Sequence, residues 1–182
     1  MHATHAAVLG APSAKPRALR VGVLSDTHGL LRPEARAFLL GCDYIIHGGD
    51  IGTASVLEDI AAIAPLTAVR GNIDKGAWAR RLRETELIRL GDVFAYVLHD
   101  LTQLNIEPKA AQVRVVVSGH SHQPMVRQRD GVLFLNPGSC GPRRFRLPIS
   151  IGELWITGTR VRARTIELPG SPRNGVEDSA QK

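Results

Sequence analysis

The sequence is poor in aromatic residues and cysteine, and it has no long hydrophobic run. Phe, Trp and Tyr make up 4% of the 182 residues, too few to predict a surface on which successive nucleic-acid bases stack. The two cysteines, Cys42 and Cys140, do not suggest a disulfide framework, and reduced thiols are typical of the cytoplasm. No apolar stretch approaches the roughly 20 residues that a membrane-spanning helix needs. We therefore expect a cytoplasmic protein that does not cross a membrane.

Positive charge is in excess, with a formal net charge of +6 and a pI near 10.0. Basic proteins can bind nucleic acid. Most of this charge is arginine, however, and it is scattered. Arg160, Arg162 and Arg164 alternate with less polar residues, a period of two that is typical of a strand with one solvated face. Nucleic acid is therefore not the favoured partner, and a nuclease stays an alternative that rests on charge alone.

The length of 182 residues predicts a single domain. Residues 1–17 are rich in alanine, contain Pro12 and Pro16, and lack the apolar segment of a signal peptide. Residues 169–182 combine glycine, proline, serine and charged residues without apolar periodicity. We predict one domain over residues 18–168 between two disordered tails, 1–17 and 169–182.

The first half of this domain alternates strand and helix patterns. Continuous apolar runs predict buried strands at 21–24, 44–46 and 66–69. Pro33 is placed to open one helix between them, and a second helix is predicted from 54 to 63. This strand–helix–strand order predicts that neighbouring strands run parallel.

The second half is rich in strands without helices. Pairs of apolar runs around short turns predict hairpins at 86–97, 126–135 and 149–168, and another apolar strand is predicted at 113–117. Two stacked sheets with helices outside would bury the apolar strands of both halves. The predicted fold class is therefore α/β, a two-sheet β-sandwich flanked by helices.

Polar side chains with metal-binding atoms follow five of the predicted strands. Loops that leave the carboxyl ends of strands are where an α/β sheet gathers ligands. Carboxylate, imidazole and carboxamide donors without thiolates favour manganese, iron or zinc over copper(I) or a structural zinc. We predict a site for two divalent ions formed by Asp26, His28, Asp50, Asn72, His99, His120 and His122.

Three of these residues also have an ordinary structural explanation. Asp50 follows two glycines and could cap the next helix, and Asn72 could be a turn asparagine. His99 alone would be a partly buried histidine at a strand end. The two histidines of Gly119-His120-Ser121-His122 are harder to explain structurally. His47 is interpreted as a packed histidine rather than a direct ligand.

The order Asp-x-His, Gly-Asp, Gly-Asn, His, Gly-His-x-His resembles the calcineurin-like metallophosphoesterases. The segments 25–29, 47–50 and 136–139 are similar to the compact bacterial and archaeal phosphodiesterase branch, which also resembles the retromer subunit with the same fold. The likeness covers about residues 21–166. It implies a four-layer α/β/β/α sandwich of two mixed sheets with a dinuclear metal centre.

The resemblance also implies how the ligands are shared between the ions. The first ion would take Asp26, His28, Asp50 and His122, and the second would take Asp50, Asn72, His99 and His120. Asp50, Asn72 and His99 would have catalytic roles. Two ions about 3.5–4 Å apart can share a water, lower its pKa and produce a hydroxide that attacks phosphorus. Mn²⁺ is the expected metal, with iron, zinc or nickel as alternatives.

Two departures from the family pattern concern the leaving group and the space near the ions. Relatives carry histidine or cysteine after Gly-Asn, where this chain has Ile73, which cannot donate a proton. Asp74 is the nearest candidate for that catalytic role, or it could orient His28. Asp100 stands after His99 where glycine is common, and it could crowd the site or bind a water. We therefore expect hydrolysis that favours activated leaving groups such as nitrophenyl esters.

The turn after the last motif supplies candidate substrate contacts. Backbone N–H groups and side chains of Asn136 and Ser139 could line the pocket, although a purely structural turn is equally consistent with the sequence. Arg143 could hold a substrate phosphate or could be a surface arginine.

The sequence thus predicts a metal-dependent phosphodiesterase that hydrolyses small phosphate esters and could form homo-oligomers. The alternative is a catalytically weak scaffold of the same fold that binds proteins. The complete set of seven ligands favours the enzyme, because a scaffold has no physical need for so many polar donors at one place.

Overall fold

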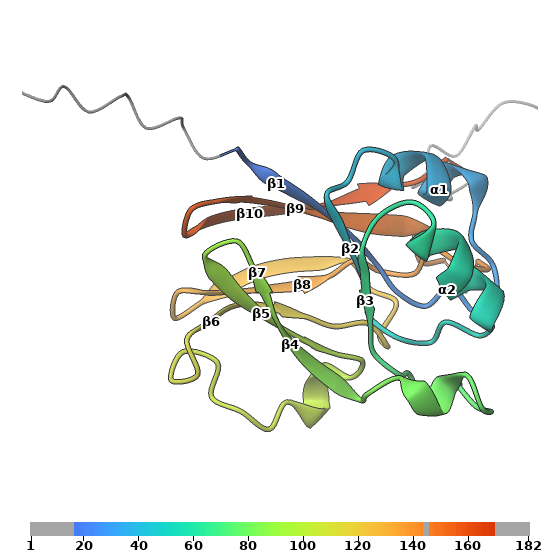
Figure 1. Ribbon diagram of the computed structural model, residues 1–182, viewed down its shortest axis with the longest axis horizontal. Helices are drawn as coiled ribbons and strands as arrows, with labels where there is room; N and C mark the ends of the chain where they lie inside the picture. Colours follow the sequence, from blue (N-terminus) through green and yellow to red (C-terminus); the bar gives the residue numbers. More distant parts are fainter. Residues whose placement is uncertain (1–16, 144–145, 170–182) are drawn as a thin grey trace, which may run out of the picture.

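The computed structural model describes residues 17–143 and 146–169, so most of both predicted tails lies outside the described residues. Two five-stranded sheets stack face to face (Figure 1). Sheet A has the order β10-β9-β1-β2-β3. Its strands are β1 (Leu19–Leu24), β2 (Tyr44–His47), β3 (Leu66–Ala68), β9 (Ser150–Thr157) and β10 (Arg160–Glu167).

Sheet B has the order β4-β5-β6-β8-β7. Its strands are β4 (Thr85–Leu90), β5 (Val93–Leu98), β6 (Val113–Val117), β7 (Met125–Arg129) and β8 (Val132–Asn136). The parallel neighbours are β1 with β2 and β3, which run to one edge of sheet A, and β5 with β6 and β8, which form the centre of sheet B. The antiparallel hairpin β9-β10 lies beside β1 in sheet A, and the hairpins β4-β5 and β7-β8 form the two sides of sheet B. The predicted strands and turns are confirmed to within a few residues.

The apolar core fills the space between the two sheets. Val23 and Ile46 from sheet A and Val97, Val117 and Leu135 from sheet B are 0% exposed in it. Strands such as β6 are apolar at nearly every position because their other face is covered as well. Stacking of the sheets therefore accounts for the continuous apolar runs in the sequence.

Two helices cover the outer face of sheet A (Figure 1). Helix α1 (Pro33–Leu39) begins at the predicted proline. Helix α2 (Ala54–Ala61) buries Val56 and Ile60, which lie four residues apart on one helix face. It ends two residues before the predicted position, because Ile63 turns back and donates its N–H to the carbonyl of Ile60.

A loop rather than an α-helix covers the outer face of sheet B. The connection between β5 and β6 contains only the short 3-10 helix η2 (Leu101–Gln103) among its described residues, and Leu104 and Ile106 pack on Tyr96 and Val116. Pro108 within this connection disfavours a longer helix. The two-sheet sandwich of the predicted fold class is confirmed, with this loop as its fourth layer. Within the described ranges, no helix is long and apolar enough to cross a membrane.

Candidate functional site

The seven predicted ligands lie in loops that follow β1, β2, β3, β5 and β6. Because β1, β2 and β3 are parallel neighbours and β5 and β6 are also parallel, the carboxyl ends of the strands in each sheet meet at one edge. Backbone hydrogen bonds join the loops to each other. Asp26 N–H donates to Gly49 O at 3.0 Å, His28 N–H to Asp50 O at 3.0 Å, and Gly119 N–H to His99 O at 2.9 Å.

Five of these seven residues have a left-handed backbone. Elsewhere in the described chain only Gln112 and Asp130 share this feature among residues other than glycine. A positive φ costs free energy in a residue with a Cβ, and such residues concentrate at functional sites. Their φ values are 56° for Asp26, 46° for His28, 55° for Asp50, 66° for His120 and 57° for His122.

A first group of donors consists of Asp26, His28 and His122. The Nε2 atoms of the two histidines are 3.4 Å apart, and Nε2 of His122 is 3.2 Å from Oδ1 of Asp26. Oδ2 of Asp50 lies 3.9 Å from Nε2 of His28. Asp26 is 0% exposed, and its Oδ1 accepts no hydrogen bond from the described residues. A buried carboxylate oxygen without a donor beside two imidazole nitrogens fits a divalent cation.

A second group lies on the other side of Asp50. Nε2 of His99 is 3.0 Å from Oδ1 of Asn72 and 3.3 Å from Oδ1 of Asp50, and Nδ1 of His120 is 3.2 Å from the same Asn72 oxygen. Nδ1 of His99 lies 2.7 Å from the carbonyl of Gly48, and donation to this carbonyl directs Nε2 towards the two oxygens. The ligand atoms of Asp26, Asp50 and His99 lie within 4.8 Å of one another, so the carboxylate of Asp26 also reaches this group.

The electrostatics of the second group favour positive charge at His99. Burial lowers the pKa of His99, but the hydrogen bonds with Asp50 and Gly48 outweigh this effect and raise it. Burial raises the pKa of Asp50, but hydrogen bonds from His99 and the N–H of Ile73 outweigh it and lower the pKa. The carboxylate of Asp50 thus favours a positive charge at Nε2 of His99, and a metal ion bound there would take the place of the proton.

His47 is the packed histidine that the sequence predicts. It is 0% exposed. Its Nδ1 accepts the N–H of Gly49 at 3.1 Å, which leaves Nε2–H to donate to the hydroxyl of Thr27 at 2.9 Å. The Thr27 hydroxyl in turn donates to the carbonyl of Ile51. Burial lowers the pKa of His47 to about 3, so the ring is neutral and links the loops after β1 and β2.

A pH-dependent stability follows from His47. The unfolded chain binds a proton at this histidine below about pH 6.5, whereas the folded protein does not until about pH 3. The free energy of unfolding should therefore fall as the pH falls through this window, by about 1.4 kcal/mol per pH unit from this group. Urea unfolding of the chelated protein at pH 7, 6 and 5 should show a steeper fall than that of His47→Gln. Equal slopes would contradict the assignment.

The catalytic role predicted for Asp74 is not supported by its contacts. Its Oδ1 accepts the N–H groups of Ile51 and Gly52, each at 2.9 Å, and its Oδ2 accepts the N–H of Gly71 at 2.8 Å. The residue is 5% exposed. Both oxygens thus hold backbone groups, and Asp74 ties the loop that carries Asp50 to the loop that carries Asn72.

The structure places the side chains of Asn136 and Ser139, the predicted substrate contacts, in hydrogen bonds with the loops around the site. The side-chain amide of Asn136 donates to the carbonyl of Gly119 at 2.6 Å and to the hydroxyl of Ser121 at 3.1 Å, and its oxygen accepts the N–H of Gly138. The Ser139 hydroxyl donates to the carbonyl of Asp26. Both side chains are buried and hold the loops that carry the ligands, and their roles in substrate binding stay predictions.

Arg143 remains a candidate substrate contact. It is exposed and lies with His122 and Ser139 along a narrow crevice.

Asp100 begins helix η2 instead of closing the site. Its Oδ1 accepts the N–H and the hydroxyl of Thr102 at 2.9 and 2.8 Å. Burial raises the pKa of Asp100, but these two hydrogen bonds outweigh it and lower the pKa. Oδ2 of Asp100 lies 4.0 Å from Nε2 of His120, so the carboxylate adds negative charge beside that imidazole.

A cleft of about 490 Å³ opens beside Asn72, His99 and His120. Its other walls come from the loop after β3, the start of β4, the end of β5 and the loop before β6, and they are mostly polar. Sequence reasoning missed these residues because they carry no motif and are far apart along the chain. Those with side chains able to bind a polar substrate are Arg70, Lys75, Gln103 and Asn105.

Comparison with known proteins agrees with this geometry. The sequence profile of the calcineurin-like phosphoesterase superfamily domain matches residues 19–157, and the chain belongs to this superfamily. It is a phosphoric ester hydrolase by relationship. It is 34% identical over 164 residues to a probable metallophosphoesterase of Methanothermobacter thermautotrophicus, covering 84% of this chain and 94% of that protein.

Two further similarities concern a phosphodiesterase and a protein-sorting subunit. The chain is 26% identical over 140 residues to a phosphodiesterase of Methanocaldococcus jannaschii, covering 67% of this chain and 84% of that protein. The structure of vacuolar protein sorting 29 from Cryptosporidium parvum superposes with a TM-score of 0.68 at 17% identity, covering 82% of this chain and 97% of that one. The second similarity shows the fold alone.

Proposed function

We propose that this protein is a metal-dependent phosphodiesterase that acts on small phosphate esters. The observation that carries the proposal is the pair of donor groups on either side of Asp50, with the buried Oδ1 of Asp26 lacking a hydrogen-bond donor among the described residues. Asp26, His28 and His122 would hold one ion, and Asn72, His99 and His120 the other, with Asp50 shared. Oxygen and nitrogen donors without thiolate suit Mn²⁺.

Bound ions would activate a water and neutralise charge on the transferred phosphoryl group. The protein's own groups set the geometry for that chemistry. His99 is oriented by the Gly48 carbonyl, and Asp74 and Asn136 fix the loops that carry the ligands. The rest of the substrate would lie in the cleft beside His120, where the ammonium of Lys75 can bind anionic oxygens. The guanidinium of Arg70 lines the same cleft and pairs there with Glu84.

The side chain at position 73 limits which esters react. Ile73 is 39% exposed and has no proton to give, and Asp74 beside it is occupied by three backbone N–H groups. Without a general acid, the departing oxygen must be stable as an anion. Esters with good leaving groups should therefore react much faster than alkyl esters.

We also place the protein in the cytoplasm as part of this proposal. Cys42 and Cys140 are both free and buried. Burial raises the pKa of Cys140 to about 12, so its thiol stays protonated despite lying near the metal site, and it is unreactive. Reduced, unreactive thiols fit a reducing compartment.

Hydrolysis of bis(4-nitrophenyl) phosphate tests the proposal. Purified protein should release nitrophenol with added Mn²⁺, and excess chelator should reduce the rate at least about 100-fold, since the ions supply the nucleophile. Asp50→Asn should resemble the chelated protein, and Asp92→Asn, at an exposed carboxylate, should match wild type. Folded protein that releases no nitrophenol with manganese, iron, zinc or nickel would refute the enzyme and favour the scaffold.

A further inference from the structure

A second polar surface lies on the outer face of sheet A, at the end of the sandwich away from the candidate metal site. We call it the arginine–tryptophan face and define it by Arg20, Trp155, Arg160, Arg162 and Arg164. An open groove of about 710 Å³ runs over it and is lined by Trp155, Arg160 and Arg162 together with Ala18, Thr157 and Thr159. From Ala18, β1 runs roughly 20 Å before it reaches the loop of Asp26.

Strand register brings these side chains together. Trp155 of β9 pairs with Arg162 of β10 on one side and with Arg20 of β1 on the other. Arg160 and Arg164 are two residues from Arg162 along β10 and therefore share its face. Helices α1 and α2 cover the end of sheet A toward which β1 runs (Figure 1), and Trp155 remains 38% exposed.

The face has an excess of positive charge that its own carboxylate does not neutralise. Glu153 is 1% exposed and binds both Arg20 and Arg164, each at 2.6 Å. Asp43 pairs with Arg17 at the edge of the face. Within the described residues, Arg160 and Arg162 make no ion pair. The face thus carries four guanidinium groups and one buried carboxylate. Arg20 and Arg164 bind this carboxylate, which leaves Arg160 and Arg162 available to an anionic ligand.

Trp155 adds an aromatic surface to this charge. The guanidinium of Arg20 lies 6.0 Å from the centre of its ring and holds the indole from one side. Exposed aromatic rings can stack with nucleic-acid bases. A strand face that only carries solvated arginines has no need of an exposed ring, so Trp155 favours a binding surface. The low aromatic content of the sequence predicts no stacking surface, but folding places one of its few aromatic rings among the arginines.

We propose that the arginine–tryptophan face binds single-stranded nucleic acid. Phosphates would contact Arg160 and Arg162, and a base would stack on Trp155. Alternate residues of a strand are roughly 6.6 Å apart, which is comparable to the separation of successive phosphates in an extended single strand. The alternative is a purely structural role. Strand β10 is an edge strand, and its arginines would then only prevent it from pairing with strands of other chains.

Fluorescence anisotropy with a labelled 12-nucleotide oligothymidylate tests this proposal on the full chain. Chelator is present so that no ester is cleaved, and the result does not depend on the proposed phosphodiesterase activity. The oligonucleotide should bind with a salt slope of about −1.4, from two phosphate contacts. Trp155→Leu should weaken binding about tenfold, the usual loss of one stacked base. Arg160→Ser with Arg162→Ser should weaken it at least as much and reduce the salt slope by about 1.4.

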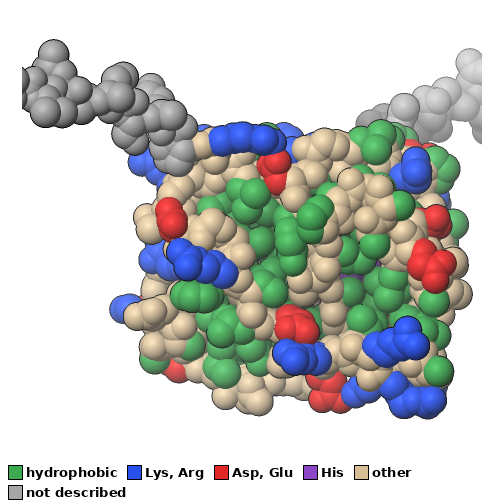
Figure 2. Space-filling model, in the orientation of Figure 1, with side chains coloured by type: hydrophobic (Ala, Val, Ile, Leu, Met, Phe, Trp, Pro, Cys, Tyr) green, Lys and Arg blue, Asp and Glu red, His purple; other side chains and the backbone are tan. Residues whose placement is uncertain are grey.

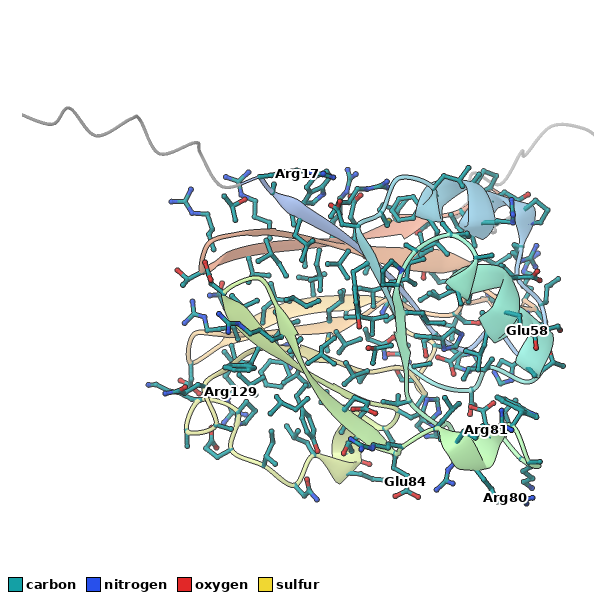
Figure 3. All side chains as sticks on the ribbon, viewed as in Figure 1. Arg17, Glu58, Arg80, Arg81, Glu84 and Arg129 are labelled. Carbon is teal, nitrogen blue, oxygen red and sulfur yellow. The ribbon has the colours of Figure 1, made fainter. Side chains whose placement is uncertain are left out.

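The matched control removes the same charge elsewhere. Arg80 and Arg81 lie on the 3-10 helix η1 (Ala79–Arg81). Figure 3 labels both residues, and they lie far from Arg17, which precedes β1. Figure 2 likewise shows separate groups of Lys and Arg side chains near these two ends of the molecule. Arg80→Ser with Arg81→Ser should leave binding nearly unchanged. Absence of binding at low salt, equal losses in the two double variants, or equal affinity for a 12-base-pair duplex would each overturn the proposal.

Discussion

Gly71→Ala is expected to abolish hydrolysis of the nitrophenyl diester and binding of the proposed second ion. A Cβ at Gly71 would lie 2.1 Å from the backbone nitrogen of Asp50 and 2.1 Å from its Oδ1. Backbone atoms cannot yield without moving the whole loop after β2. Such overpacking costs on the order of 3 kcal/mol or more, and the relief available to the chain is to displace the carboxylate that both donor groups share.

Metal content and activity should therefore fall together in Gly71→Ala. The measurement is metal per protein by elemental analysis after dialysis with Mn²⁺, together with kcat/KM on the nitrophenyl diester. Gly152→Ala is the matched control, since its Cβ would meet only side-chain carbons at 3.2 Å or more, and it should keep both properties. A Gly71→Ala protein with wild-type metal content and rate would show that the position of Asp50 is not required.

Asp74→Ala is expected to lower the free energy of unfolding by about 3 kcal/mol or more. It leaves three backbone N–H groups of buried loops without an acceptor, and each buried unsatisfied donor costs about 1–3 kcal/mol before water enters. The midpoint of urea unfolding should fall without a change in the m-value. Activity should also fall, because Asp74 joins the loops that carry Asp50 and Asn72.

Asp74→Asn separates this positioning role from a role as proton donor. Its amide oxygen can still accept the N–H groups of Ile51 and Gly52, but its NH₂ group would face the N–H of Gly71. We expect a loss of stability smaller than in Asp74→Ala, weaker Mn²⁺ binding by calorimetry, and a pH–rate profile of unchanged shape. If instead the pH–rate profile of Asp74→Asn no longer falls at high pH, while stability and metal binding are intact, Asp74 supplies the proton. Asp92→Ala, at an exposed carboxylate, is the control.

Much of the fold could be predicted from the sequence, because the hydrophobic pattern identifies the strands and helices and their order along the chain indicates how the strands pair. Strand β6 is recognisable from Val113–Val117 because both of its faces are buried. The positions of the seven ligands follow from the rule that strand ends gather polar residues. Their sharing between two ions came from family resemblance, since spacing alone does not say whether His120 or His122 approaches Asn72.

The sequence could not predict which polar side chains near the site bind backbone groups of the loops. That depends on which backbone N–H and carbonyl groups the folded loops leave without a partner. Asp74 and Asn136 have polar side chains next to the site, so they are naturally interpreted as catalytic or substrate-binding residues. Only the folded loops show that both are occupied by N–H groups and carbonyls. The cleft and the arginine–tryptophan face were missed for a related reason, because cross-strand neighbours such as Trp155 and Arg20 are distant in sequence.

Anomalous diffraction from a crystal soaked in Mn²⁺ tests the central claim most directly. The account predicts two manganese peaks on either side of the Asp50 carboxylate, one against Asp26, His28 and His122 and the other against Asn72, His99 and His120. Ordered donors at these positions without any manganese peak between them, or peaks only elsewhere on the protein, would contradict it.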